Sequence, residues 1–264
     1  MSISPEASVE QDGVPAQRRV DGGPAADRAV RLLPLVREAT ERLDLIVAGL
    51  GEHALRQPSR LPGWSRAHVV THLARNADAL VNLLTWARTG VEHPMYASRA
   101  DRDADIEEGA GRLAQVLHED LHAAGDRFMV AATELPVRAW AASVVARLQG
   151  PIPAADIPSM RLHEVWVHLV DLDVDFTFPG IPADHLEHVL ETALSPHLDR
   201  PDGPAVRLTA ELSGDRTRTW EMVGAPGDRT YEVAGPAADV IAWLTGRGDG
   251  SALRGDVPDL PAWG

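Results

Sequence analysis

A glutamate and a histidine in one short run have the spacing of a metal-binding pair. Glu164 and His168 are four residues apart in RLHEVWVH, residues 161–168, so on a helix their side chains point within about 40° of each other. The run is strongly apolar, where an unpaired carboxylate would be costly and a bound metal would satisfy both groups. The run differs from the zincin HExxH motif, because His163 and His168 are five apart and lie about 140° around a helix. We therefore expect His163 to face away.

A second run, AHVVTHLARN at residues 67–76, offers a third ligand. His68 and His72 are four apart and share a helix face, and His72 lies deeper in the apolar part of the run. A catalytic zinc takes three protein ligands and keeps one position open. The spacing therefore predicts a metal site of His72, Glu164 and His168. The alternative is an ordinary buried hydrogen bond between a histidine and Glu164, with the other histidine in the core.

Other polar residues lie where they could support this site. Asn76 and Asp171 are each about one turn beyond a predicted ligand, where they would either orient it or face solvent. Arg247 belongs to GRGDG, residues 246–250, which follows a predicted helix and so is not a phosphate-cradling loop. Arg247 could still reach a carboxylate across a cleft.

Composition excludes several kinds of chemistry. The 264 residues contain no cysteine, and all 25 basic residues are arginine. Disulfides, cysteine metal sites, cysteine nucleophiles, Schiff bases and Walker-type phosphate loops are therefore excluded. A net charge of −14 argues against a general nucleic-acid binder. If the predicted metal site is right, any sulfur nucleophile must arrive as a cofactor, and arginine is the only permanently charged basic side chain in the sequence.

Helical periodicity places the predicted ligands on long elements. We expect helices at about residues 26–50, 65–89, 101–133 and 156–176, which suggests a bundle, and a shorter one at 182–195. In the third helix, Leu113, Val116, Leu117, Leu121 and Phe128 form the expected apolar stripe. The predicted ligands then lie on the second and fourth helices.

The pattern changes after about residue 200. The runs 205–212, 218–223 and 229–235 predict strands of a small antiparallel sheet, and 236–246 predicts a helix. We expect a flexible N-terminal arm at 1–25, a helical bundle at 26–198 and a small α+β domain at 199–264. The chain has no run that could span a membrane and no signal peptide at its start, so we expect a cytoplasmic protein.

Four segments resemble a known family. The run LPGWSRAHVVTHLARN at 61–76 and the run RLHEVWVHLVD at 161–171 resemble the two metal motifs of DinB-like mycothiol-dependent enzymes. The run WARTGVEHPMY at 86–96 and GRGDG at 246–250 further resemble the mycothiol-dependent maleylpyruvate isomerase family. The likeness covers about residues 26–264. It implies a fold of class α plus small α+β: a DinB-like four-helix bundle followed by a sterol-carrier-protein-like C-terminal domain.

The resemblance also implies an activity. It predicts cis–trans isomerisation of maleylpyruvate to fumarylpyruvate at a zinc–thiolate site, with zinc or another divalent metal and mycothiol as cofactors. His72, Glu164 and His168 would be the metal ligands and Arg247 a catalytic arginine. The partners would be a small anionic substrate and a low-molecular-weight thiol, without nucleic acid or membrane. Two alternatives stay open, a mycothiol S-transferase acting on other electrophiles and a non-enzymatic zinc- or thiol-binding module.

Overall fold

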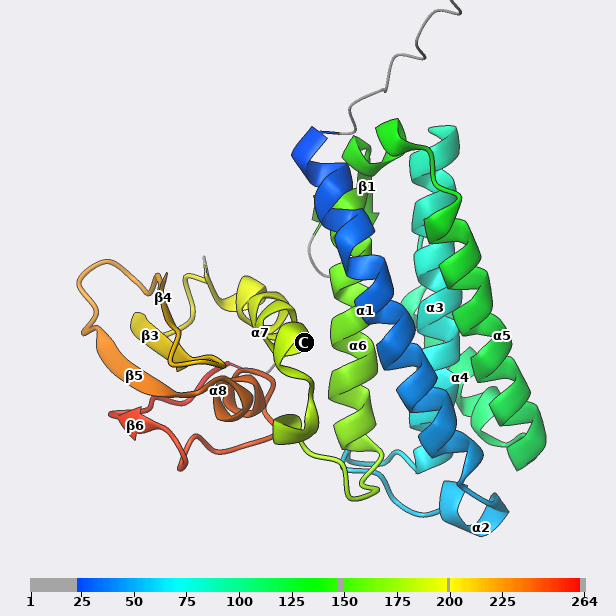
Figure 1. The fold of residues 1–264 in the computed structure, drawn as a ribbon. Coiled ribbons are helices and arrows are strands. Elements are labelled where there is room, and N and C mark those ends of the chain that lie inside the picture. The colour runs from blue at the N-terminus through cyan, green and yellow to red at the C-terminus, as the bar shows by residue number, and fades with distance from the viewer. Residues whose placement is uncertain (1–22, 147–149, 199, 262–264) are drawn as a thin grey trace, which may run out of the picture.

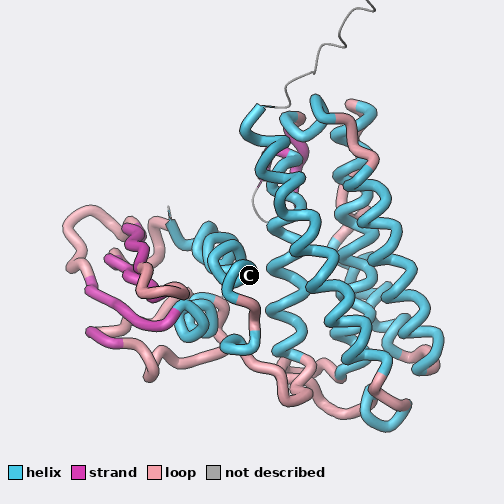
Figure 2. The backbone as a smooth tube through the Cα atoms, viewed as in Figure 1, coloured by secondary structure: helices cyan, strands magenta, loops and turns pink. Residues whose placement is uncertain are grey.

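The protein is mostly helical, with a small sheet in its C-terminal part (Figures 1 and 2). The computed structural model describes residues 23–146, 150–198 and 200–261. Most of the predicted N-terminal arm lies outside the described residues, and residues 23–25 already belong to the first helix. The division into an arm and two domains stays a prediction.

Four long helices lie side by side and enclose the main core (Figure 1). They are α1 (Gly23–Ala48), α3 (Arg66–Thr89), α5 (Ala114–Thr133) and α6 (Ile157–Asp171). Helices α1 and α3 each pack against both α5 and α6. Apolar side chains recur on their facing sides and are buried there, among them Val36, Leu43, Leu73, Leu80, Leu117, Leu121, Phe128, Leu162 and Leu169. Burial of these stripes holds α3 against α6.

The two helices of the predicted metal site have clear local signals. Helix α3 begins after Ser65, whose backbone N–H donates to Nδ1 of His68, and ends at Gly90 with φ 72°. Both boundaries confirm the prediction. Helix α6 begins after Asp156 as expected but ends at Asp171, about five residues early. The chain leaves the helix there because Asp173 and Asp175 take φ values of 55° and 57°.

The prediction of one helix at 101–133 is wrong. The structure has α4 (Arg99–Ala110) and α5, separated at residues 111–113. Leu113 and Val116, placed in the apolar stripe, are 69% and 42% exposed, because the break turns the start of α5 away from the core. Helix α4 instead packs against α3, and Gly109 permits the close approach: a Cβ there would lie 2.3 Å from Cγ2 of Thr71.

The sequence patterns did not predict several short elements. They are α2 (Glu52–Leu55), the hairpin of β1 (Ser143–Ala146) and β2 (Gly150–Pro153), and the 3₁₀ turns η1 (Val137–Ala141), η2 (Ala154–Asp156) and η3 (Phe178–Gly180). Each is too short to show a helical or strand period.

The C-terminal part combines two helices with a four-stranded sheet. Its elements are α7 (Ala183–Leu198), β3 (Val206–Glu211), β4 (Thr217–Met222), β5 (Tyr231–Pro236), α8 (Ala237–Leu244) and β6 (Arg254–Gly255). The strand order is β4-β3-β5-β6. The expectation of a purely antiparallel sheet is wrong, because β5 adds to the side of β3 opposite β4 and runs parallel to it. Helix α7 packs against both α6 and α8, which ties the sheet to the long helices.

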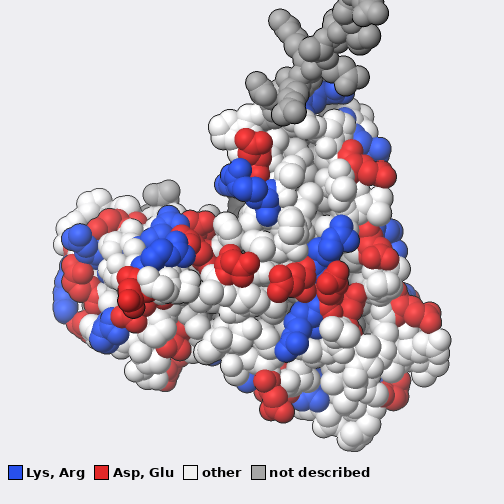
Figure 3. All heavy atoms as spheres, in the orientation of Figure 1, with Lys and Arg blue, Asp and Glu red and all other residues white. Residues whose placement is uncertain are grey.

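Charge is mixed on the face drawn in Figure 3, where acidic and basic side chains lie among one another. Among the described helices, none is both long and apolar enough to cross a membrane.

Candidate metal centre

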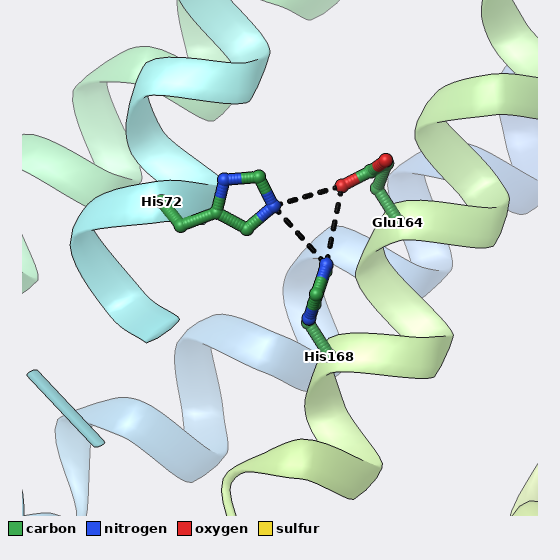
Figure 4. Close-up of side chains that lie close together, drawn as sticks. All are labelled: His72, Glu164 and His168. Atoms are coloured by element: carbon green, nitrogen blue, oxygen red, sulfur yellow. Dashed lines mark hydrogen bonds and ion pairs between the residues drawn. The ribbon is translucent and has the colours of Figure 1, made fainter. Parts of the chain in front are cut away.

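Helices α3 and α6 bring three donor atoms to one point (Figure 4). Nε2 of His72 lies 3.0 Å from Oε2 of Glu164 and 3.1 Å from Nε2 of His168. Nε2 of His168 lies 3.4 Å from the same glutamate oxygen. A tetrahedral ion with bonds of about 2.0–2.1 Å holds its ligand atoms roughly 3.3 Å apart. The three predicted ligands therefore have the chemistry and the spacing of a zinc-type site.

The centre lies deep but is not sealed. His72 and His168 are buried, whereas the side chain of Glu164 keeps 25% of its surface exposed. Both histidines come from apolar helix faces, and their rings meet edge to face with centroids 4.5 Å apart. Solvent thus reaches the cluster on the side of Glu164.

Burial and charge set the protonation of His72 and Glu164, whereas at His168 burial is outweighed by the hydrogen bonds with Asp171 and Glu164, which raise its pKa. Burial lowers the pKa of His72 to about 4, with a contribution from His168, so its imidazole is neutral at pH 7. Burial by itself would raise the pKa of Glu164, but hydrogen bonds with His168 and His72 outweigh it and hold the pKa well below its ordinary value. A neutral imidazole and an ionised carboxylate are the forms that bind a metal.

A carboxylate from the end of α6 supports His168. Nδ1 of His168 lies 2.9 Å from Oδ2 of Asp171, which is fully buried. The carboxylate also accepts from Nε and Nη2 of Arg247, at 3.1 and 2.7 Å. Burial would raise the pKa of Asp171, but His168 and Arg247 lower it. Arg247 was predicted to reach a carboxylate. It lies in the C-terminal part and is linked to the centre through the carboxylate of Asp171.

His72 has different neighbours. Its Nδ1 lies 3.3 Å from Nη2 of Arg102 on α4, and the ring of Trp64 lies 5.6 Å away. His68, the other histidine of the run, is not part of the cluster, because its two nitrogens face Ser65 and Glu107. The position of each histidine along the apolar run predicted this difference.

The remaining polar residues of the two runs lie outside the cluster. Asn76 is buried and accepts from Nη1 of Arg161 at 3.0 Å, so it supports the joint between α3 and α6 rather than a ligand directly. Arg161 is fully buried, and it also donates to the carbonyl of Leu73 at 2.8 Å. His163 faces α7, with Nδ1 3.3 Å from the carbonyl oxygen of Val189, as expected.

Sequence reasoning missed Trp64, Arg102 and Arg161 as neighbours of the centre. Arg161 could have been found, since it is three residues before Glu164 and shares its helix face. Trp64 and Arg102 gave no such signal, because each reaches His72 only through the packing of separate elements.

The chain is similar to proteins of one family. A sequence model described as the mycothiol maleylpyruvate isomerase N-terminal domain matches residues 36–173, which contain the whole candidate metal centre. Two crystal structures of the mycothiol-dependent maleylpyruvate isomerase, one of them of a histidine-to-alanine mutant, are 30% identical to the chain. Each match covers 89% of this chain and 97% of the other, with a TM-score of 0.76.

Curated relatives are more distant. An uncharacterised protein of Mycobacterium tuberculosis, found in two strains, is 24% identical over 232 residues. The match covers 80% of this chain and 83% of the relative.

Proposed function

Since the chain belongs to the mycothiol-dependent maleylpyruvate isomerase family, we propose that it converts maleylpyruvate to fumarylpyruvate with mycothiol as its thiol cofactor. The observation that carries this proposal is the meeting of His72, Glu164 and His168 in one cluster of metal-binding geometry. Family membership also supports a DinB-like bundle at 26–198 and a sterol-carrier-protein-like domain at 199–264.

We propose that His72, Glu164 and His168 hold a zinc ion or another divalent metal. When bound, the metal would favour the thiolate form of mycothiol, whose reversible addition to the conjugated double bond removes the π character that forbids rotation. The three side chains would hold the ion, and the partly exposed side chain of Glu164 lies on the side that solvent reaches. None of them needs to move a proton, because the thiolate adds and later leaves as the same anion.

Arg247 would act as the catalytic arginine. Its guanidinium is held at the centre by Asp171 and by the carbonyl of Thr245, which accepts from Nη1 at 2.6 Å. From there it would pair with a substrate carboxylate or with the oxygen on which negative charge develops. The Asp171 contact fixes the guanidinium beforehand, so little ordering is needed when the substrate binds.

An absorbance assay of maleylpyruvate tests the proposal. The purified protein, loaded with zinc, should isomerise maleylpyruvate in the presence of mycothiol and consume no thiol. Chelation should abolish turnover and zinc should restore it, whereas full activity without metal would contradict the scheme. The mutant His68→Ala is the matched control, because His68 lies on the same helix face but outside the cluster.

The same assay separates the two alternatives. A mycothiol S-transferase would consume thiol in proportion to the electrophile added. A non-enzymatic zinc- or thiol-binding module would neither change the absorbance nor consume thiol.

A further inference from the structure

Arg102 is a second guanidinium near the metal centre: it lies beside His72, whereas Arg247 lies beside Asp171. Its side chain is only 15% exposed, and Nη2 lies 3.3 Å from Nδ1 of His72. Nη1 lies 2.7 Å from Oδ1 of Asp103, and the guanidinium carbon lies 5.8 Å from the centroid of the Tyr96 ring. Helix α4 thus places a cation directly against one of the proposed metal ligands.

The contact between Arg102 and His72 has a definite hydrogen-bond polarity. A guanidinium can only donate, so Nδ1 of His72 must accept, and the imidazole proton then lies on Nε2. A metal ligated through Nε2 needs the lone pair of that nitrogen, which moves the proton to Nδ1. The N–H of Arg102 and the N–H on Nδ1 of His72 would then face each other, and neither could accept a hydrogen bond from the other. His168 differs, because its Nδ1 already faces an acceptor, Asp171.

Metal binding through Nε2 of His72 and the Arg102 contact therefore exclude each other. When the metal is held, the guanidinium must find another acceptor. The carboxylate beside it, Asp103, is 52% exposed and pairs with Arg99 as well. An ion pair so exposed contributes little. Arg247, by comparison, is held in two hydrogen bonds by the buried carboxylate of Asp171.

We propose that Arg102 determines substrate specificity by binding a carboxylate of the electrophilic substrate, and that metal loading frees it for this contact. A substrate with two carboxylates would then meet Arg102 from α4 and Arg247 from the C-terminal part. The inference rests on the proposed function, because it takes the cluster to be the reaction centre. It extends that function by assigning the preference for an acidic electrophile to a residue of α4.

Binding of maleate, a small cis-dicarboxylate, tests the role of Arg102 without any turnover. Calorimetric titrations of the zinc-loaded protein, without thiol, would compare the wild type with Arg102→Met, Arg102→Lys and Arg99→Met. Arg99 is the matched control: it lies on the same helix and also pairs with Asp103, but its side chain is 84% exposed. Arg102→Met should weaken maleate binding about tenfold or more, because a charge-assisted contact is lost. Arg102→Lys should recover part of the affinity, and Arg99→Met should bind like the wild type.

Two further measurements separate this role from a structural one. Zinc affinity of Arg102→Met, measured by chelator competition, should equal or exceed that of the wild type, because a competing donor at His72 has been removed. KM for maleylpyruvate should rise more than kcat falls. The proposal is overturned if Arg102→Met binds maleate as the wild type does, if it loses zinc, or if the zinc-loaded wild type does not bind maleate. Arg102-dependent maleate binding by a protein that does not isomerise maleylpyruvate would instead contradict the proposed function alone.

Discussion

Asp171 accepts a hydrogen bond from Nδ1 of His168 at 2.9 Å while its carboxylate is fully buried. The bond fixes the tautomer of His168, so its Nε2 carries a lone pair that faces the other two donor atoms. Carboxylates that hold a histidine in this way raise its basicity and orient its ring towards a metal.

The first prediction concerns this carboxylate. Replacing Asp171 with Asn should lower zinc affinity about 10- to 100-fold, because an amide holds the histidine more weakly than a carboxylate does. Chelator competition measures the affinity directly. Asp175→Asn is the control, since Asp175 is exposed and its φ of 57° suits asparagine. Equal zinc affinity in Asp171→Asn and the control would show that His168 needs no such support.

The second prediction separates the two histidines of α3. His72→Ala should lose most of the bound zinc, because it removes one of three converging donor atoms. His68→Ala should keep the zinc and lose only some stability, since it removes a hydrogen bond at the start of the helix. Zinc measured by elemental analysis after gel filtration decides between them. Retention of zinc by His72→Ala would remove that residue from the proposed ligand set.

The pairing of Glu164 with His168 was predictable because its geometry is local, whereas its meeting with His72, 92 residues away, depends on the packing of α3 against α6. Spacings of four on two apolar runs fix which side chains share a helix face, and apolar surroundings select His72 over His68. The contact of Asp171 with His168 follows from a spacing of three on the same helix. The contacts of Arg102 and Arg247 do not follow from helix spacing, because they join residues that are 30 and 76 positions apart in the chain.

The break between α4 and α5 was missed for a physical reason. Residues 101–133 are rich in alanine and acidic residues, which suit a helix throughout, and Gly109 and Gly111 lie within this run. Glycine in a helical pattern lowers helix propensity without ending the helix by itself. Packing of α4 against α3 decides the outcome. This packing also places Arg102 beside His72, so the error in the fold and the missed site residue have one cause.

A third prediction tests that packing. Gly109→Ala should lower the free energy of unfolding by about 1–3 kcal/mol, because its Cβ would lie 2.3 Å from a methyl carbon of Thr71. Chemical denaturation measures the change. The control is Gly51→Ala, whose Cβ would meet nothing within 4 Å. A Gly109→Ala protein as stable as the wild type would mean that α4 can move away from α3 at little cost.

A fourth prediction concerns Arg247. Arg247→Met should lower kcat by about 100-fold or more, the effect expected when a donor to developing charge is removed. Zinc content should stay unchanged, because Asp171 still holds His168. Arg254→Met is the control, since Arg254 is an exposed arginine of the same C-terminal part. Loss of zinc together with activity would assign Arg247 a structural role instead.

The fifth prediction is a dependence of stability on pH through His197. This side chain is 3% exposed, and Nε2 lies 3.0 Å from the carbonyl oxygen of Leu244 on α8. Burial lowers the pKa of His197, so the folded protein resists protonation there. In the unfolded chain the pKa returns to about 6.5, so below that pH the unfolded state binds more protons and the free energy of unfolding falls.

Replacing His197 with Gln should make this loss shallower, because glutamine keeps an N–H donor for Leu244 but does not titrate. Denaturation series between about pH 5 and 7.5, which bracket the ordinary histidine pKa, compare the two slopes. His53→Gln serves as the control, because His53 is exposed. If His197→Gln and His53→Gln lose stability with acid as steeply as the wild type, then the sensitivity to acid arises elsewhere, and the contact between α7 and α8 does not depend on a neutral His197.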